Sequence, residues 1–170
     1  MDKSSSNDLS FWPLSKSRRY ILFPTLQNLI SDKKRNSVVD IGCAEGDLCM
    51  ILAKDPAIHS ICGIDISSTL IKNAEEKKKL LSLSEYNKIS YIMGDALQLL
   101  PLSKPVDIII LAHILCMSKN LEELATYFKI TYDSLCSSGT LLISVPHPAF
   151  DNITSKSLQR IYHEPYTYFS

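Results

Sequence analysis

Residues 38–46 read VVDIGCAEG, a short apolar run that holds one acid and leads into a loop of small residues. The β-branched residues favour a strand, and Gly42 and Gly46 allow the backbone to turn sharply and approach a ligand closely. A buried strand followed by such a turn and a helix is typical of α/β folds with a parallel sheet. The segment therefore predicts a ligand site at the end of the first strand.

The alternation of strand and helix continues along the chain. We expect a helix over 15–30, with Pro24 as a candidate break, and a left-handed turn at Gly139. The predicted strands are 37–41, 60–65, 89–93, 106–112 and 140–145. Three further helices are predicted: the first over 46–54, the second capped by Ser67 or Ser68, and the third capped by Asn120. This order implies a parallel sheet with right-handed crossovers, which binds ligands at the carboxyl ends of its strands.

Small residues, acids or both stand at four consecutive strand ends. The later three read GIDIS at 63–67, MGDA at 93–96 and LAHIL at 111–115. Across roughly residues 36–146 this ordered set resembles the class I S-adenosylmethionine-dependent methyltransferases. The resemblance implies a Rossmann-like, doubly wound α/β fold with five parallel strands. It also implies S-adenosylmethionine as cofactor, S-adenosylhomocysteine as product, and methyl transfer as the reaction.

The resemblance also implies roles for individual residues. Asp65 would accept hydrogen bonds from the ribose hydroxyls, and Ile66 would pack on the adenine. Asp95 would accept from the adenine amino group, and Asp40 would orient the turn and the ammonium end of the cofactor. The full predicted cofactor-binding set is Arg19, Asp40, Gly42, Cys43, Ala44, Gly46, Asp65, Ile66, Gly94, Asp95, Ala96, Ala112 and His113. Ala44 replaces the middle glycine of the family's turn, for which we expect a small shift of the methionine end.

A nicotinamide-binding domain is the nearest competing interpretation. Its Gly-x-Gly-x-x-Gly fingerprint needs glycine at positions 44 and 47, where the chain has Ala44 and Asp47. A pyrophosphate also prefers a helix N-terminus without acids, whereas Glu45 and Asp47 lie in this turn. The sulfonium and ammonium of adenosylmethionine tolerate acidic surroundings, so the methyltransferase interpretation is preferred.

The sequence assigns no catalytic residue, because methyl transfer depends chiefly on aligning two reactants. His113 and His147 are the candidates, and His113 would act either as a base near the acceptor or as part of the pocket wall. No Asn/Asp-Pro-Pro-Tyr/Phe turn and no Pro-Cys pair is present. The segment 144–150 resembles small-molecule methyltransferases of the ubiquinone and biotin pathways. We therefore expect a small-molecule oxygen, nitrogen or carbon acceptor; the alternative is a catalytically silent domain that activates a partner.

Charge and composition suggest a cytoplasmic protein that acts on neither nucleic acid nor membrane. Eighteen basic residues balance eighteen acidic ones, and a nucleic-acid binder usually carries a basic surplus. The five cysteines form no Cys-x-x-Cys pair, so no metal site is expected. No apolar run reaches the roughly 18 residues of a membrane span.

Three segments are expected along the chain. Residues 1–14 form a flexible N-terminus, 15–150 the methyltransferase domain, and 151–170 a C-terminal segment that begins a substrate or cap region or is truncated. The family's C-terminal strand hairpin then looks missing or truncated. A homodimer or a partner protein would cover the open sheet edge.

Overall fold

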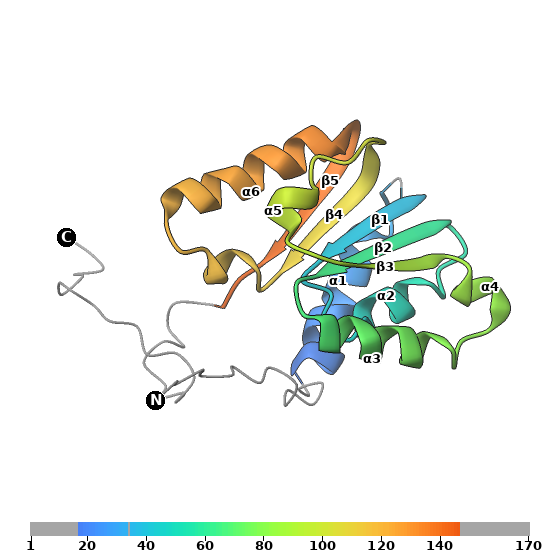
Figure 1. Cartoon of the computed structure of the whole chain (residues 1–170). Helices are drawn as coiled ribbons and strands as arrows, with labels where there is room; N and C mark the ends of the chain where they lie inside the picture. The colour runs from blue at the N-terminus through green and yellow to red at the C-terminus, as the bar shows by residue number, and fades with distance from the viewer. Residues whose placement is uncertain (1–16, 34, 147–170) are drawn as a thin grey trace, which may run out of the picture.

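The computed structural model describes residues 17–33 and 35–146. This part of the chain forms one five-stranded parallel sheet in the order β3-β2-β1-β4-β5 (Figure 1). The strands are β1 Ser37–Ile41, β2 Ser60–Asp65, β3 Ile89–Met93, β4 Val106–Ala112 and β5 Leu135–Ser144. The helices are α1 Phe23–Ile30, α2 Asp47–Leu52, α3 Ser68–Lys78, α4 Leu83–Tyr86, α5 Ala96–Leu99 and α6 Leu121–Ser134, with a π-helical turn η2 Arg18–Leu22 and a 3-10 turn η3 Leu115–Met117. The predicted Rossmann-like parallel fold is confirmed.

Alternate residues of the central strands supply two separate hydrophobic cores. Val38 and Ile108 pack with residues of α1 and α2 on one face of the sheet. Val39 and Ile109 pack with residues of α5 and α6 on the other face. Figure 1 shows the same two helical layers, with α5 and α6 on one side of the sheet and α1, α2 and α3 on the other. Because both faces are covered, the strands are nearly continuous apolar runs.

The strand order reverses between β1 and β4. β1 pairs with β2 on one side and with β4 on the other, and Ile41 lies beside both Ile64 and Leu111. The chain leaves β1 toward β2 and leaves β4 toward β5, so the two loops diverge and open a crevice between them. The fold therefore places the loops after β1 and β4 at the position where such sheets bind ligands.

Two sequence expectations fail at the element ends. Gly139 does not form a left-handed turn after α6, because it lies within β5. Val106 pairs with Leu135 while Ile108 pairs with Thr140, so the extra residues of β5 form an irregularity in the ladder. Pairing with β4 extends the strand back to the end of α6, which local turn preference alone does not indicate.

Pro24 does not end the N-terminal helix. It stands in the first turn of α1, where its missing N–H costs no hydrogen bond. The π-helical turn η2 lies just before it, and the Thr25 hydroxyl donates to the Ile21 carbonyl at 2.7 Å. The helix therefore continues through the proline by way of one wider turn.

Predicted helix caps lie at the start of α3 and α6. The Ser67 hydroxyl accepts from the Leu70 N–H, and Asn120 Oδ1 accepts from the Glu123 N–H at 2.8 Å. Each cap satisfies one of the backbone donors that a helix leaves unpaired at its N-terminus.

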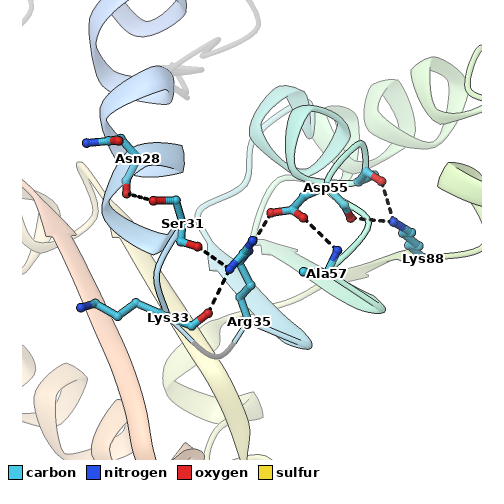
Figure 2. A network of polar contacts seen from close by, with 8 residues as sticks. Asn28, Ser31, Lys33, Arg35, Asp55, Ala57 and Lys88 are labelled. Atoms are coloured by element: carbon cyan, nitrogen blue, oxygen red, sulfur yellow. Dashed lines mark hydrogen bonds and ion pairs between the residues drawn. The ribbon is translucent and has the colours of Figure 1, made fainter.

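A polar network joins α1, α2 and β3 at the amino-terminal edge of the sheet (Figure 2). Arg35 Nε donates to Asp55 Oδ2 at 2.7 Å, and Arg35 Nη1 donates to the Ser31 carbonyl at 2.6 Å. The Lys88 ammonium donates to the carbonyls of Ala53 and Asp55. This network satisfies carbonyl groups that follow α1 and α2, at the edge of the sheet opposite the loops that follow β1 and β4.

Within residues 17–33 and 35–146, the helices are too short or too polar to cross a membrane. Several expectations fall on other residues. The flexible segment 1–14, the C-terminal segment 151–170, the missing hairpin and His147 all lie outside the described part of the chain.

Candidate functional site

A cavity lies at the switch point between β1 and β4. Its wall comes from three places: the end of β1 with its loop and the start of α2, the end of β4 with its loop, and the junction of η2 and α1. The lining residues are Arg18, Leu22, Phe23, Asp40, Gly42, Cys43, Ala44, Asp47, Leu48, Ala112, His113 and Ile114. Six of the predicted cofactor residues are among them.

The loop after β1 has a backbone that small residues make possible. Gly42 and Gly46 both adopt positive φ angles, 76° and 74°, and Ala44 between them has φ 49°. A Cβ on Gly42 would overlap the side chain of Ile114, and one on Gly46 would overlap the Tyr91 ring. The loop is therefore tightly packed from both sides, and its backbone lines the cavity.

Asp65 ties the loop after β1 to the loop after β2. Its Oδ2 accepts from the Ala44 N–H at 2.9 Å, and its Oδ1 accepts from the Ser67 N–H at 2.9 Å. The Gly94 N–H donates to the Asp65 carbonyl at 2.9 Å, which adds the loop after β3. Three strand ends are thus connected through one residue.

Asp40 is a buried acid at the base of the cavity, with 3% of its surface exposed. The Cys49 thiol donates to its Oδ2 at 3.5 Å. Burial raises the pKa of Asp40 to about 7, because a carboxylate loses hydration inside the protein; the Cys49 contact and the Arg18 charge partly oppose this. Asp40 therefore changes charge near neutral pH.

The other acids of the loop are held by α3. The Lys77 ammonium lies 2.6 Å from Glu45 Oε2 and 3.0 Å from Asp47 Oδ1, and Asn73 Nδ2 donates to Glu45 Oε1 at 3.0 Å. The hydrogen bond from Lys77 lowers the pKa of Glu45, so this side chain stays ionised. These contacts fix the loop against α3 and offset part of its negative charge.

His113 lies at the opposite wall of the cavity in a left-handed conformation, with φ 63°. The backbone N–H of His113 donates to the Ser144 carbonyl at 2.8 Å, which ties the end of β4 to the end of β5. Partial burial, and then the charge of Arg18, lowers the pKa of His113. The imidazole is therefore neutral at neutral pH.

The remaining predicted residues lie outside the cavity lining. Gly46 stands in the loop after β1, Asp65 is the last residue of β2, and Ala96 is the first residue of α5. Ile66, Gly94 and Asp95 stand on the loops after β2 and β3 at the same edge of the sheet. Asp95 caps α5 by accepting from the Leu97 N–H at 2.9 Å, and Ile66 is 71% exposed. Ile66 and Met93 give this edge an exposed apolar surface beside Asp95.

Arg18 lines the cavity, whereas its predicted neighbour Arg19 is exposed on η2 and does not. The expectation that Arg19 contacts the cofactor stays a prediction, and the residue of this segment that lines the cavity is its neighbour Arg18. The signal in the sequence was present but ambiguous, because two adjacent arginines point to different sides of a helix and the π-helical turn changes which side faces the protein. Leu22 and Phe23, which follow on the same segment, were not predicted either.

A family comparison identifies the chain. The model of the methyltransferase domain family Methyltransf_31 matches residues 32–164, which include β1 to β5. The chain belongs to this methyltransferase family. The predicted class, a class I S-adenosylmethionine-dependent methyltransferase domain, is thereby confirmed.

Two tRNA (guanine-N(7)-)-methyltransferases are similar to this methyltransferase domain in sequence. The protein of Prochlorococcus marinus strain AS9601 is 32% identical over 137 residues, which cover 81% of this chain and 58% of that protein. The protein of strain MIT 9215 is 33% identical over 73 residues, which cover 43% of this chain and 34% of that protein. The chain thus spans little more than half the length of the first relative.

Solved structures, among them a named methyltransferase, share the fold. The N-methyltransferase NodS from Bradyrhizobium japonicum WM9 aligns with a TM-score of 0.69 at 22% identity, over 84% of this chain and 76% of NodS. NodS has also been solved in complex with S-adenosyl-L-homocysteine. The PH0226 protein from Pyrococcus horikoshii OT3 aligns with a TM-score of 0.63 at 28% identity, over 78% of this chain and 55% of that protein.

The expectation of a small-molecule acceptor and no nucleic acid was wrong, since both sequence relatives are named as tRNA methyltransferases. The small-molecule acceptor was inferred from segment 144–150 and from absent acceptor motifs, and the exclusion of nucleic acid from the balance of charges over the whole chain. Phosphate groups respond instead to the charges within about 10 Å, the screening length at 0.1 M salt, so a neutral total does not exclude a local nucleic-acid surface.

Proposed function

We propose that this domain binds S-adenosylmethionine at the β1–β4 switch point and transfers its methyl group to a nucleic-acid base. The observation that carries the donor half of the proposal is the cavity between the glycine-containing loop and the loop after β4. Such a crevice is the ligand position of open α/β sheets.

The residues around the cavity fit this cofactor. The backbone of Gly42 and Ala44 permits close approach of a ligand. A larger side chain at position 42 would collide with Ile114. Each oxygen of the Asp65 carboxylate accepts one hydrogen bond from a backbone N–H. Each oxygen therefore keeps a second lone pair that can accept from a ribose hydroxyl. Asp40, half-ionised near pH 7, and Asp47, paired with Lys77, leave a partial negative charge at the cavity that suits a cation.

The chemistry belongs to the cofactor, which supplies a methyl group activated on a sulfonium. The protein's own work is to align the reactants and exclude water, and alignment alone lowers a barrier by as much as ~7–11 kcal/mol. A neutral His113 places no second positive charge beside the sulfonium. This is the role that the lowered pKa of His113 supports.

For the acceptor we propose N7 of a guanine in tRNA, the site named for the two sequence relatives. This nitrogen carries a lone pair and no proton, so its methylation requires no general base. An acceptor of this kind is compatible with a cavity whose described histidine is neutral and whose buried acid, Asp40, is half-protonated near pH 7.

Two measurements test the two halves of the proposal. Isothermal titration of the full chain with S-adenosylhomocysteine should show one site. Gly42→Val should weaken binding, because a side chain is strained at φ 76° and would push Ile114, which lines the cavity, out of its place. Unmodified tRNA incubated with methyl-labelled cofactor should then yield 7-methylguanosine after digestion. If S-adenosylhomocysteine binds but no methylated tRNA forms, the proposed acceptor is rejected and the donor site is retained. If S-adenosylhomocysteine does not bind, both halves of the proposal are rejected.

A further inference from the structure

Tyr91, in the middle of β3, stands in one row with residues of the next two strands. It pairs with Gly63 of β2, which in turn pairs with Asp40 of β1. Paired residues of a parallel sheet direct their side chains to the same face. On this face Tyr91 packs against the core cluster that contains Cys43 and Cys49. Because Gly63 has no side chain, the row leaves space between β3 and the loop after β1.

The Tyr91 ring fills the space over Gly63. A Cβ added at Gly63 would lie 2.7 Å from Tyr91 Cδ1 and 2.8 Å from Cys43 Sγ. Packed carbon atoms are normally about 3.5–4.0 Å apart, so neither neighbour leaves room for a methyl group. The ring and the Cys43 thiol therefore both lie against the bare backbone of Gly63, and the ring reaches the loop after β1 from the side of β3.

The Tyr91 hydroxyl reaches the far end of the same loop. It donates to the Gly46 carbonyl at 3.4 Å, and a Cβ on Gly46 would overlap it. Gly46 directly precedes α2, and its carbonyl also accepts from the Met50 N–H at 3.0 Å. Burial raises the pKa of Tyr91, so the hydroxyl keeps its proton and remains a donor.

We propose that Tyr91 is a positioning residue of the donor site: its ring, seated on Gly63, holds the loop after β1 where the backbone of that loop lines the cavity. The inference rests on the proposed donor site. Asp65 holds the middle of the loop independently, so loss of the ring should move the loop without unfolding the site. The cavity-lining residues that such a movement would displace are Gly42, Cys43, Ala44, Asp47 and Leu48.

The first test compares Tyr91→Leu with Tyr91→Phe by isothermal titration of the full chain with S-adenosylhomocysteine. Leucine removes the ring, and we expect the dissociation constant to rise about tenfold. Phenylalanine keeps the ring and loses one weak hydrogen bond, so it should restore the dissociation constant to within about threefold of the wild-type value. A solely structural role would lower the thermal midpoint and the fraction of binding-competent molecules and leave the dissociation constant unchanged.

Tyr86→Leu is the matched control. Tyr86 is also half-buried, but it lies on α4, with its ring centre 4.3 Å from the Lys78 ammonium. Its replacement should lower the thermal midpoint and leave the dissociation constant at the wild-type value.

Gly63→Ala reaches the same contact from β2. Its methyl group would displace the Tyr91 ring and the Cys43 thiol, so affinity should fall although Tyr91 is intact. In a double-mutant cycle, Gly63→Ala should cost less affinity in Tyr91→Leu, where the ring is absent. Wild-type affinity in Gly63→Ala or in Tyr91→Leu would overturn the inference, and if Tyr91→Leu does not fold, Gly63→Ala decides. If the wild type does not bind S-adenosylhomocysteine, the proposed donor site itself is rejected.

Discussion

The Asp65 carboxylate, at the end of β2, accepts a hydrogen bond from the backbone N–H of Ala44 in the loop after β1, with 2.9 Å between nitrogen and Oδ2. Its second oxygen accepts from the Ser67 N–H. One side chain therefore fixes both loops and holds the backbone of the β1 loop in place at the cavity.

Asp65→Asn should loosen this connection. An asparagine has one acceptor oxygen and presents its NH₂ group to a backbone N–H, so one of the two hydrogen bonds is lost. We expect the free energy of unfolding to fall by about 1–3 kcal/mol. Affinity for S-adenosylhomocysteine should fall at least about tenfold. Urea denaturation and calorimetry measure the two effects.

Asp32→Asn is the control for that substitution, because Asp32 is a surface residue paired only with its neighbour Lys33 in the described structure. It should leave stability and affinity unchanged. Unaltered nucleoside affinity in Asp65→Asn would contradict the role given to the loop connection.

Ala44→Gly should stabilise the protein. Ala44 has φ 49°, a left-handed conformation that costs a non-glycine residue roughly 1–2 kcal/mol, and glycine loses about 0.5–1 kcal/mol more chain entropy on folding. The net gain in the free energy of unfolding is about 0.5 kcal/mol. Ala125→Gly, on the exposed side of α6, should instead cost about 1 kcal/mol, because there the backbone is helical. Equal losses in both variants would disprove the strain at Ala44.

Asp40 should give stability a distinctive pH dependence. Burial raises its pKa from 3.8 to about 7, so between these values the folded protein keeps a proton that the unfolded chain has released. The contribution of Asp40 to the free energy of unfolding therefore falls as pH rises from about 4 to 7 and is constant above that range. Asp40→Asn removes this dependence and keeps an oxygen for the Cys49 thiol.

Denaturation of wild type and Asp40→Asn at several pH values checks the effect. The stability of the variant relative to the wild type should increase with pH up to about 7 and then level off. Curves that stay parallel across this window would show that Asp40 ionises in the folded protein as it does in the unfolded chain.

The network around Arg35 should affect stability without affecting ligand binding. Arg35 and Asp55 are mostly buried, and Arg35 also binds the carbonyls of Ser31 and Lys33 (Figure 2). Arg35→Met should lower the free energy of unfolding by about 1–2 kcal/mol. Affinity for S-adenosylhomocysteine should stay within about twofold, because the network lies at the opposite edge of the sheet from the cavity.

Lys33→Met provides the comparison on the same loop, since its pair with Asp32 is exposed and worth little. A double-mutant cycle of Arg35→Met with Asp55→Asn isolates the energy of the pair. A coupling energy near zero would mean that the backbone contacts of Arg35 stabilise this edge without Asp55.

The sequence by itself determined the parallel α/β fold and the limits of β1 to β4. Apolar runs that end in glycines and acids are local signals, and a strand buried on both faces needs no distant information to be recognised. The same signals placed Asp40, Gly42, Ala44 and His113 at strand ends, which the topology then gathered at one edge.

Only the tertiary structure decided which neighbours matter. Pairing with β4 drew Gly139 into β5, and the packing of η2 put Arg18 in the cavity lining while Arg19 is exposed. The charge state of Asp40 follows from burial beneath α2, which no local pattern encodes. The physical reason is common to all three: side-chain direction and hydration depend on what the rest of the chain packs against that position.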